Sequence, residues 1–204
     1  MNNNILIAGR IHKGISYAQY MDRTKVKLLS ANINDFNSEE LKTFEYTKLN
    51  LQRSLRIEKN YSISPELKAA VSGLEKDQTW VVLTEDWCGD SAQTLPYIAK
   101  IAESSRKVEL SILLRDSNPD IMDLYLTNGT RSIPKLIAFD RDWNEIFQWG
   151  PRPQEARDLF LRLKTQDLPK EKIYEQLHLW YANNKGAAIE HEFLALLDSY
   201  KSHR

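Results

Sequence analysis

A strand, a helix and a second strand follow one another in the middle of this chain, and this order limits the fold more than any other feature. Residues 78–84 and 108–114 are short apolar runs, which are typical of buried strands. Residues 91–104 between them predict a helix. A strand–helix–strand unit implies a crossover connection that leaves the two strands parallel in one sheet.

Two further strands complete this sheet in the prediction. Residues 135–139 read as a third strand and residues 143–149 as a fourth, with a tight turn at residues 140–142 between them. Strands joined by a tight turn are antiparallel. We therefore expect the α/β class with a central mixed sheet.

The first 74 residues predict an N-terminal helical extension, 1–74. Tyr17, Tyr20 and Met21 share one face of its first helix. Ser64 as N-cap and Pro65 at the first helical position start a later one. Between them a longer helix opens at Ser38, and its expected apolar side consists of Leu41, Phe44, Leu51 and Leu55.

The end of the chain predicts two more helices. Each carries one apolar stripe, and Gly186 separates them. We expect residues 166–204 to form a helical hairpin that packs on the sheet domain. The stripes consist of Ile173, Leu177 and Trp180, and of Ile189, Phe193, Leu196, Leu197 and Tyr200.

Composition excludes several classes of partner. The 204 residues hold 28 basic and 28 acidic side chains without a basic stripe, which argues against a nucleic-acid partner. No apolar run approaches the roughly 20 residues that span a bilayer, so we expect no membrane partner. Residues 1–8 do not resemble a secretory signal. A single cysteine cannot form a disulfide within the chain, and together these features favour a cytoplasmic location.

Cys88, the only cysteine, stands where the strand at 78–84 gives way to the helix at 91–104. The free N–H groups and the dipole at a helix N-terminus favour an anion, and the thiolate is the reactive form of cysteine. The alternative is a small buried apolar residue, which is the commoner role of a lone cysteine. Position alone leaves both interpretations open.

Three carboxylates surround this cysteine in the sequence. Glu85, Asp86 and Asp90 lie close to Cys88, and no lysine or arginine lies within seven residues on either side. Like charge disfavours a thiolate, so the helix terminus and the carboxylates act in opposite directions and the sign of the pKa shift stays open. We expect Glu85 and Asp86 to be solvated loop carboxylates, with proton transfer to or from the thiol as the alternative. Asp90, in the first turn of the helix, should complement the helix dipole. The three charges should favour neutral or basic disulfides over anionic ones such as glutathione.

The middle of the chain resembles thioredoxin. Trp87-Cys88-Gly89 lies at a strand-to-helix junction, Pro96 follows eight residues after the cysteine, and Ile133-Pro134 precedes a strand. A hairpin, Gly150 and a last helix complete the resemblance, which covers residues 75–165. It implies a thioredoxin-like fold with additional N- and C-terminal helices, in which the Ile133-Pro134 bond is cis and Pro134 packs beside the thiol.

Three departures from the thioredoxin pattern bear on the chemistry. Ser91 replaces the second cysteine of the motif, Val82 replaces a buried aspartate, and Asp90 stands where proline is usual. A hydroxyl cannot release a mixed disulfide, so the pattern predicts a monothiol protein. Cys88 and Ser91 also resemble the Cys-Gly-Phe-Ser motif of monothiol glutaredoxins, which bind glutathione and iron–sulfur clusters, but Trp87 and Asp90 speak against that family.

These observations define a candidate site. Cys88 is the expected nucleophile, and a hydrogen bond from the Ser91 hydroxyl would stabilise its thiolate. The alternative for Ser91 is an ordinary first-turn helix residue whose oxygen accepts from a backbone N–H. We expect no cofactor, and the scattered histidines predict no metal site. The predicted function is a cytoplasmic monothiol protein that forms mixed disulfides with protein or low-molecular-weight thiols. The alternative is a redox-inactive module that binds a peptide or protein. The resemblance implies substrate-binding roles for Trp87, Gly89, Asp90, Ile133 and Pro134.

Overall fold

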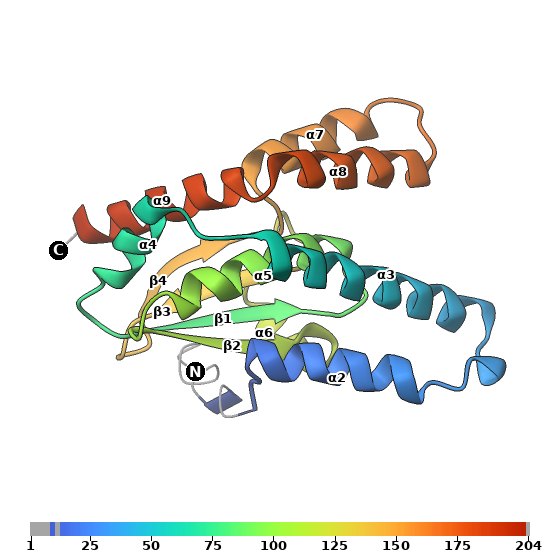
Figure 1. Ribbon diagram of the computed structural model, residues 1–204, viewed down its shortest axis with the longest axis horizontal. Coiled ribbons are helices and arrows are strands. Elements are labelled where there is room, and N and C mark those ends of the chain that lie inside the picture. Colours follow the sequence, from blue (N-terminus) through green and yellow to red (C-terminus); the bar gives the residue numbers. More distant parts are fainter. Residues whose placement is uncertain (1–8, 11–12, 203–204) are drawn as a thin grey trace.

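The computed structural model describes residues 9–10 and 13–202, so the prediction for residues 1–8 lies outside it. Its strands are β1 (Gln78–Thr84), β2 (Val108–Leu114), β3 (Lys135–Phe139) and β4 (Glu145–Trp149). Its α-helices are α2 (Tyr17–Ser30), α3 (Ser38–Asn60), α4 (Pro65–Ser72), α5 (Gly89–Glu103), α6 (Pro119–Met122), α7 (Gln154–Lys164), α8 (Lys170–Asn184) and α9 (Ala187–Ser202). Short 3-10 turns lie at η1 (Ile33–Asp35) and η2 (Arg115–Ser117). Figure 1 shows their arrangement.

The sheet has four strands in the order β2-β1-β3-β4. β1 pairs with β2 in parallel through the crossover helix α5, and it pairs with β3 in the antiparallel sense. β4 adds an antiparallel edge. This arrangement confirms the α/β class and the mixed sheet. The fourth strand begins at Glu145 rather than Trp143, because Trp143 belongs to the hairpin turn and has a φ of 62°.

Helices and loops cover both faces of the sheet, which explains why β1 is apolar without alternation. Trp80 and Val82 face one core, which α5, α4, α2 and α9 complete. Val81 and Leu83 face a second, smaller core that includes α6 and Cys88. The candidate site therefore lies on the α6 side of the sheet, at the C-terminal end of β1.

The last helix belongs to the main core. Phe193 of α9 is fully buried, and its ring lies 5.4 Å from Trp80, 6.3 Å from Phe147 and 5.7 Å from Trp149, measured between centroids. Aromatic pairs at such distances add to the free energy gained by burial. The C-terminal segment is thus integral to the sheet core.

The expected hairpin of the two last helices is wrong. In the described part of the chain α8 packs against α7, whereas α9 continues beyond the end of α8 instead of folding back along it, and packs against α4 (Figure 1). Between α8 and α9 the chain turns at Lys185 and Gly186, which have φ values of 52° and 91°. A Cβ on Gly186 would lie 2.3 Å from the Tyr97 ring, so only glycine fits there.

The expected apolar side of α3 is also wrong in part. Leu41 and Leu55 are 42% and 40% exposed. The face that packs against α5 is mainly polar, because it supplies hydrogen bonds to the chain around Cys88 instead of apolar contacts. The buried residues of this face are Thr47, Asn50, Ser54 and Ile57.

Candidate functional site

Cys88 is the N-cap residue of α5, which begins two residues earlier than the sequence predicts. Its Sγ donates a hydrogen bond to the Ile133 carbonyl oxygen at 3.3 Å, and the Ile133–Pro134 peptide bond is cis. The fold thus brings Cys88, Ile133 and Pro134 together from segments far apart in the sequence. Cys88 is 8% exposed, so the sulfur lies just below the surface.

Ser91 lies one turn into α5 and is 1% exposed. Its Oγ accepts a hydrogen bond from the Thr84 hydroxyl at 2.6 Å, which leaves the Ser91 proton free to be donated. A hydrogen bond from Ser91 to the Cys88 sulfur lowers the thiol pKa. The serine therefore occupies the position of a resolving cysteine but acts as a donor to the one sulfur present.

The thiol of Cys88 is nevertheless weakly acidic. Burial and the Asp90 carboxylate raise its pKa to about 11, from an ordinary value of 9.0. Backbone N–H groups of Asp90 and Ser91 oppose this rise but do not cancel it. Desolvation disfavours the charged form of any group, so burial at this helix terminus outweighs the favourable dipole.

Asp90 has partners from distant segments, in addition to its expected place in the first turn of the helix. Its side chain is buried and forms an ion pair with Arg152, at 2.9 Å to Nε and 2.6 Å to Nη2. The Tyr181 hydroxyl donates to the same carboxylate at 3.0 Å. Burial raises the pKa of Asp90, while the guanidinium and the hydroxyl lower it. Asp90 thereby fastens the loop before α7 and the helix α8 to the motif.

The other two carboxylates also have partners. Asp86 is salt-bridged to Lys27 of α2 at 2.8 Å, and its backbone carbonyl accepts a hydrogen bond from Asn50 at 3.1 Å. Glu85 is 8% exposed and accepts from the backbone N–H of Asp116 at 2.8 Å. Burial is the main cause of its raised pKa. The expectation of solvated carboxylates is wrong for Glu85, which is buried, and Asp86 is held in a salt bridge, because the partners of both come from distant segments.

Trp87 is half-buried beside the thiol and packs against the same apolar cluster as Cys88. The guanidinium of Arg115 lies 4.8 Å from the centroid of its ring, within the range of a cation–π contact. This stacking holds the indole at the rim of the site, where it forms part of the surface around the sulfur.

Gly89 lies beneath a histidine of α8. A Cβ at this position would lie 3.0 Å from Cε1 of His178 and 3.8 Å from Nη1 of Arg53. Gln93 holds the other side of the His178 ring through Nδ1 at 3.2 Å. Burial, together with Arg53 and Arg152, lowers the pKa of His178 to about 4, so the imidazole is neutral at pH 7.

Sequence reasoning missed four residues that shape the site. They reach the motif around Cys88 from three places: the loop before α7 supplies Arg152, α8 supplies His178 and Tyr181, and α3 supplies Arg53. Tyr181 follows the buried Leu177 by four residues, which indicates a helix face but no role in a site. No local pattern distinguishes the other three from ordinary surface residues.

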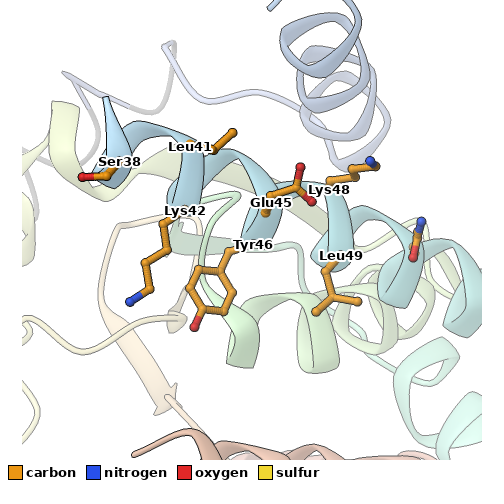
Figure 2. A pocket seen from close by; sticks show the side chains of 8 residues that line it. Ser38, Leu41, Lys42, Glu45, Tyr46, Lys48 and Leu49 are labelled. Atoms are coloured by element: carbon orange, nitrogen blue, oxygen red, sulfur yellow. The ribbon is translucent and has the colours of Figure 1, made fainter. Parts of the chain in front are cut away.

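A hollow in the described structure lies away from Cys88. It has a volume of about 610 Å³ and is lined by α3 residues that include Leu41, Lys42, Tyr46 and Leu49 (Figure 2). None of the predicted site residues lines it. The described residues contain no cluster of His, Cys, Asp and Glu suited to a metal ion. None of the described helices has the length and apolar character needed to cross a membrane.

The comparisons with known proteins agree with this geometry. A family profile described as Thioredoxin matches residues 37–169, well over half of the chain. The chain belongs to the thioredoxin family. The match begins before the resemblance that the sequence predicts, and it includes α3 within the family region. Membership supports a redox-related role in general terms.

Solved structures share the fold of this thioredoxin-family protein. An HIV epitope scaffold matches with a TM-score of 0.59 and 17% identity, over 94% of this chain and 97% of that one. A Pseudomonas aeruginosa protein of unknown function matches with a TM-score of 0.59 and 16% identity, over 91% and 93%. Both likenesses concern the fold alone, since the identities are low. No curated protein matches the sequence significantly.

Proposed function

We propose that this protein exchanges disulfides through the single sulfur of Cys88, which forms mixed disulfides that an external thiol resolves. The observation that carries this proposal is the placement of Cys88 at the start of α5, with its Sγ 3.3 Å from the Ile133 carbonyl oxygen. Trp87 and Gly89 are half-buried and contact the disulfide partner, whereas Ile133 and Pro134 are buried beside the sulfur.

The exchange proceeds in two steps. The Cys88 thiolate attacks one sulfur of a disulfide, the S–S bond breaks, and one thiolate leaves while the other sulfur stays bound to Cys88. An external thiolate then attacks the mixed disulfide and releases Cys88. Ser91 takes no covalent part, because its hydroxyl cannot form a disulfide, but it stabilises the Cys88 thiolate as leaving group.

The raised pKa of about 11 makes this exchange slow but does not abolish it. Relative to a thiol of pKa 9, the thiolate fraction at pH 7 falls ~100-fold, while the nucleophilicity of each thiolate rises roughly eightfold for a Brønsted slope near 0.45. The net rate penalty is on the order of tenfold. The proposed role is therefore stoichiometric capture of a disulfide, with little rapid turnover.

The second candidate is a redox-inactive module that binds a peptide or protein. The observation that favours it is the burial of Cys88, which is only 8% exposed and donates its thiol hydrogen to the Ile133 carbonyl oxygen. In this alternative the thiol is a small packing residue, and the surface around Trp87 holds a partner without covalent chemistry.

The two candidates differ in their reaction with an uncharged disulfide. Native protein is exposed to bis(2-hydroxyethyl) disulfide at pH 8 and followed by intact-protein mass spectrometry, with Cys88→Ser as the unreactive control. Exchange predicts one adduct that persists until dithiothreitol removes it. A protein whose thiol stays reduced and unmodified for hours would refute exchange and support the binding module.

A further inference from the structure

We propose that the disulfides accepted by Cys88 carry a carboxylate, and that the guanidinium of Arg53 binds it. This inference rests on the proposed exchange at Cys88 and names its substrate class. It reverses the preference for neutral or basic disulfides that the sequence predicts, because the charges around the site are distributed differently from the charges along the chain.

The acidic groups near the thiol have partners of their own. Asp90 is salt-bridged to Arg152, and Asp86 to Lys27. Glu85 accepts the backbone N–H of Asp116, on the η2 side of the site. These carboxylates therefore present little free negative charge to a molecule that approaches Cys88 from the side of α3 and α8.

Arg53 supplies the cation without an acidic partner. It is half-buried on α3, and its Nη1 donates a hydrogen bond to the neutral Asn50 Oδ1 at 3.0 Å. Among the described residues no carboxylate pairs with it. A guanidinium stays charged at any physiological pH and has several donors in a planar fork, so most of the donors of Arg53 remain available to a carboxylate.

The position of Arg53 relates it to the thiol. Its Nη1 lies 3.8 Å from the point that a Cβ on Gly89 would occupy, and Gly89 directly follows Cys88. Because residue 89 has no side chain, the Arg53 guanidinium and the His178 ring can both lie close to the backbone of the motif. His178 is a neutral imidazole, since its pKa is lowered to about 4, and so adds no competing charge.

Three disulfides of similar length but different charge test the proposal: 3,3′-dithiodipropionate, bis(2-hydroxyethyl) disulfide and cystamine. The second-order rate constant for adduct formation at Cys88 is divided by that of 2-mercaptoethanol with the same disulfide, which removes intrinsic reactivity. We expect the dicarboxylate to exceed the neutral disulfide by about tenfold in this ratio, as one charge-assisted contact of moderate strength provides. Cystamine should fall below both.

Two variants assign the effect to Arg53. Arg53→Gln should remove most of the roughly tenfold preference and change the neutral reaction less than about twofold, while Arg53→Lys keeps part of it. Lys48→Gln is the matched control, because it removes one positive charge from the same helix. Figure 2 shows Lys48 and Tyr46 pointing to opposite sides of α3, and Tyr46 interacts electrostatically with Arg53. This control should leave all three ratios unchanged.

The outcomes separate this inference from the proposed function. A wild-type protein that reacts with the neutral disulfide but shows no preference for the dicarboxylate would overturn the role of Arg53 alone. If Arg53→Gln lowers the rate of adduct formation equally with all three disulfides, the role of Arg53 in binding a carboxylate is also overturned. That result would indicate that Arg53 acts only by orienting Asn50. Absence of any adduct with the neutral disulfide would overturn exchange at Cys88 and this inference with it.

Discussion

Replacing Asp90 by Asn should make Cys88 more acidic and the protein less stable. Asp90 is the largest charged contributor to the raised pKa of Cys88, and the substitution removes its charge while the nearby Arg152 stays positive. Burial of the sulfur persists, so the pKa should fall from about 11 by roughly one unit or slightly more. Each unit raises the exchange rate at pH 7 about 3.5-fold, because a tenfold gain in thiolate outweighs a roughly threefold loss of nucleophilicity.

The same substitution breaks a buried ion pair. Removing one partner of such a pair costs about 3–5 kcal/mol, and the Asn carboxamide oxygen keeps one acceptor for Tyr181 or Arg152, which favours the lower end. Urea unfolding measures this loss in the free energy of unfolding. The pKa comes from the pH dependence, between pH 7 and 11, of the reaction of Cys88 with bis(2-hydroxyethyl) disulfide.

Tyr181→Phe is the matched control for this experiment. It removes a hydrogen bond to the same carboxylate at 3.0 Å but no charge. This substitution should lower the free energy of unfolding by about 1–2 kcal/mol and change the Cys88 pKa by less than about half a unit. The electrostatic account is refuted if Asp90→Asn leaves the Cys88 pKa unchanged or raises it, or if Tyr181→Phe lowers it equally.

Three further predictions follow from the same contacts. Wild-type protein should show almost no reductase-coupled reduction of insulin, since Ser91 cannot resolve a mixed disulfide. The variant Ser91→Cys should form an internal disulfide, which is measured as the loss of two thiols. A variant that never oxidises would contradict the geometry at the start of α5. The pKa of Cys88 is about 11 in the folded state, above the ordinary 9.0, so the unfolded state releases the thiol proton first as the pH rises. The free energy of unfolding, relative to that of Cys88→Ser, should therefore decline between pH 9 and 11 by up to about 2.7 kcal/mol. If urea denaturation shows the same difference between the two proteins at both pH values, the buried neutral thiol is contradicted. Phe193→Ala should cost about 3–5 kcal/mol in urea denaturation, and a loss below 1 kcal/mol would contradict the place of α9 in the core.

Local patterns predicted the elements of this fold because each depends on neighbouring residues. The apolar runs of β1 and β2 and the cap of α4 by Ser64 are of this kind. The hydrogen bond of Cys88 to Ile133 joins segments 45 residues apart, yet a family motif marks both ends of it. The placement of Cys88 beside Ile133 was therefore accessible from the sequence.

The electrostatics of the site were not accessible in this way. Asp90 meets Arg152 from 62 residues away and Tyr181 from 91 residues away. Charge counted along the chain thus gave the wrong environment for Asp90, because its partners depend on tertiary packing. The polar face of α3 has the same cause: a leucine pattern predicts an apolar contact, whereas the neighbouring motif requires hydrogen-bond donors.

The proposed exchange requires that Cys88 reacts from the folded state, although this residue is only 8% exposed. The most direct test is the rate of adduct formation with bis(2-hydroxyethyl) disulfide in urea from 0 to 1 M, well below the unfolding transition. Reaction from the folded protein predicts a rate that stays constant within about 1.5-fold. Reaction only after unfolding predicts a rise of ~10-fold or more per molar, parallel to the unfolding constant, and that result would contradict the claim.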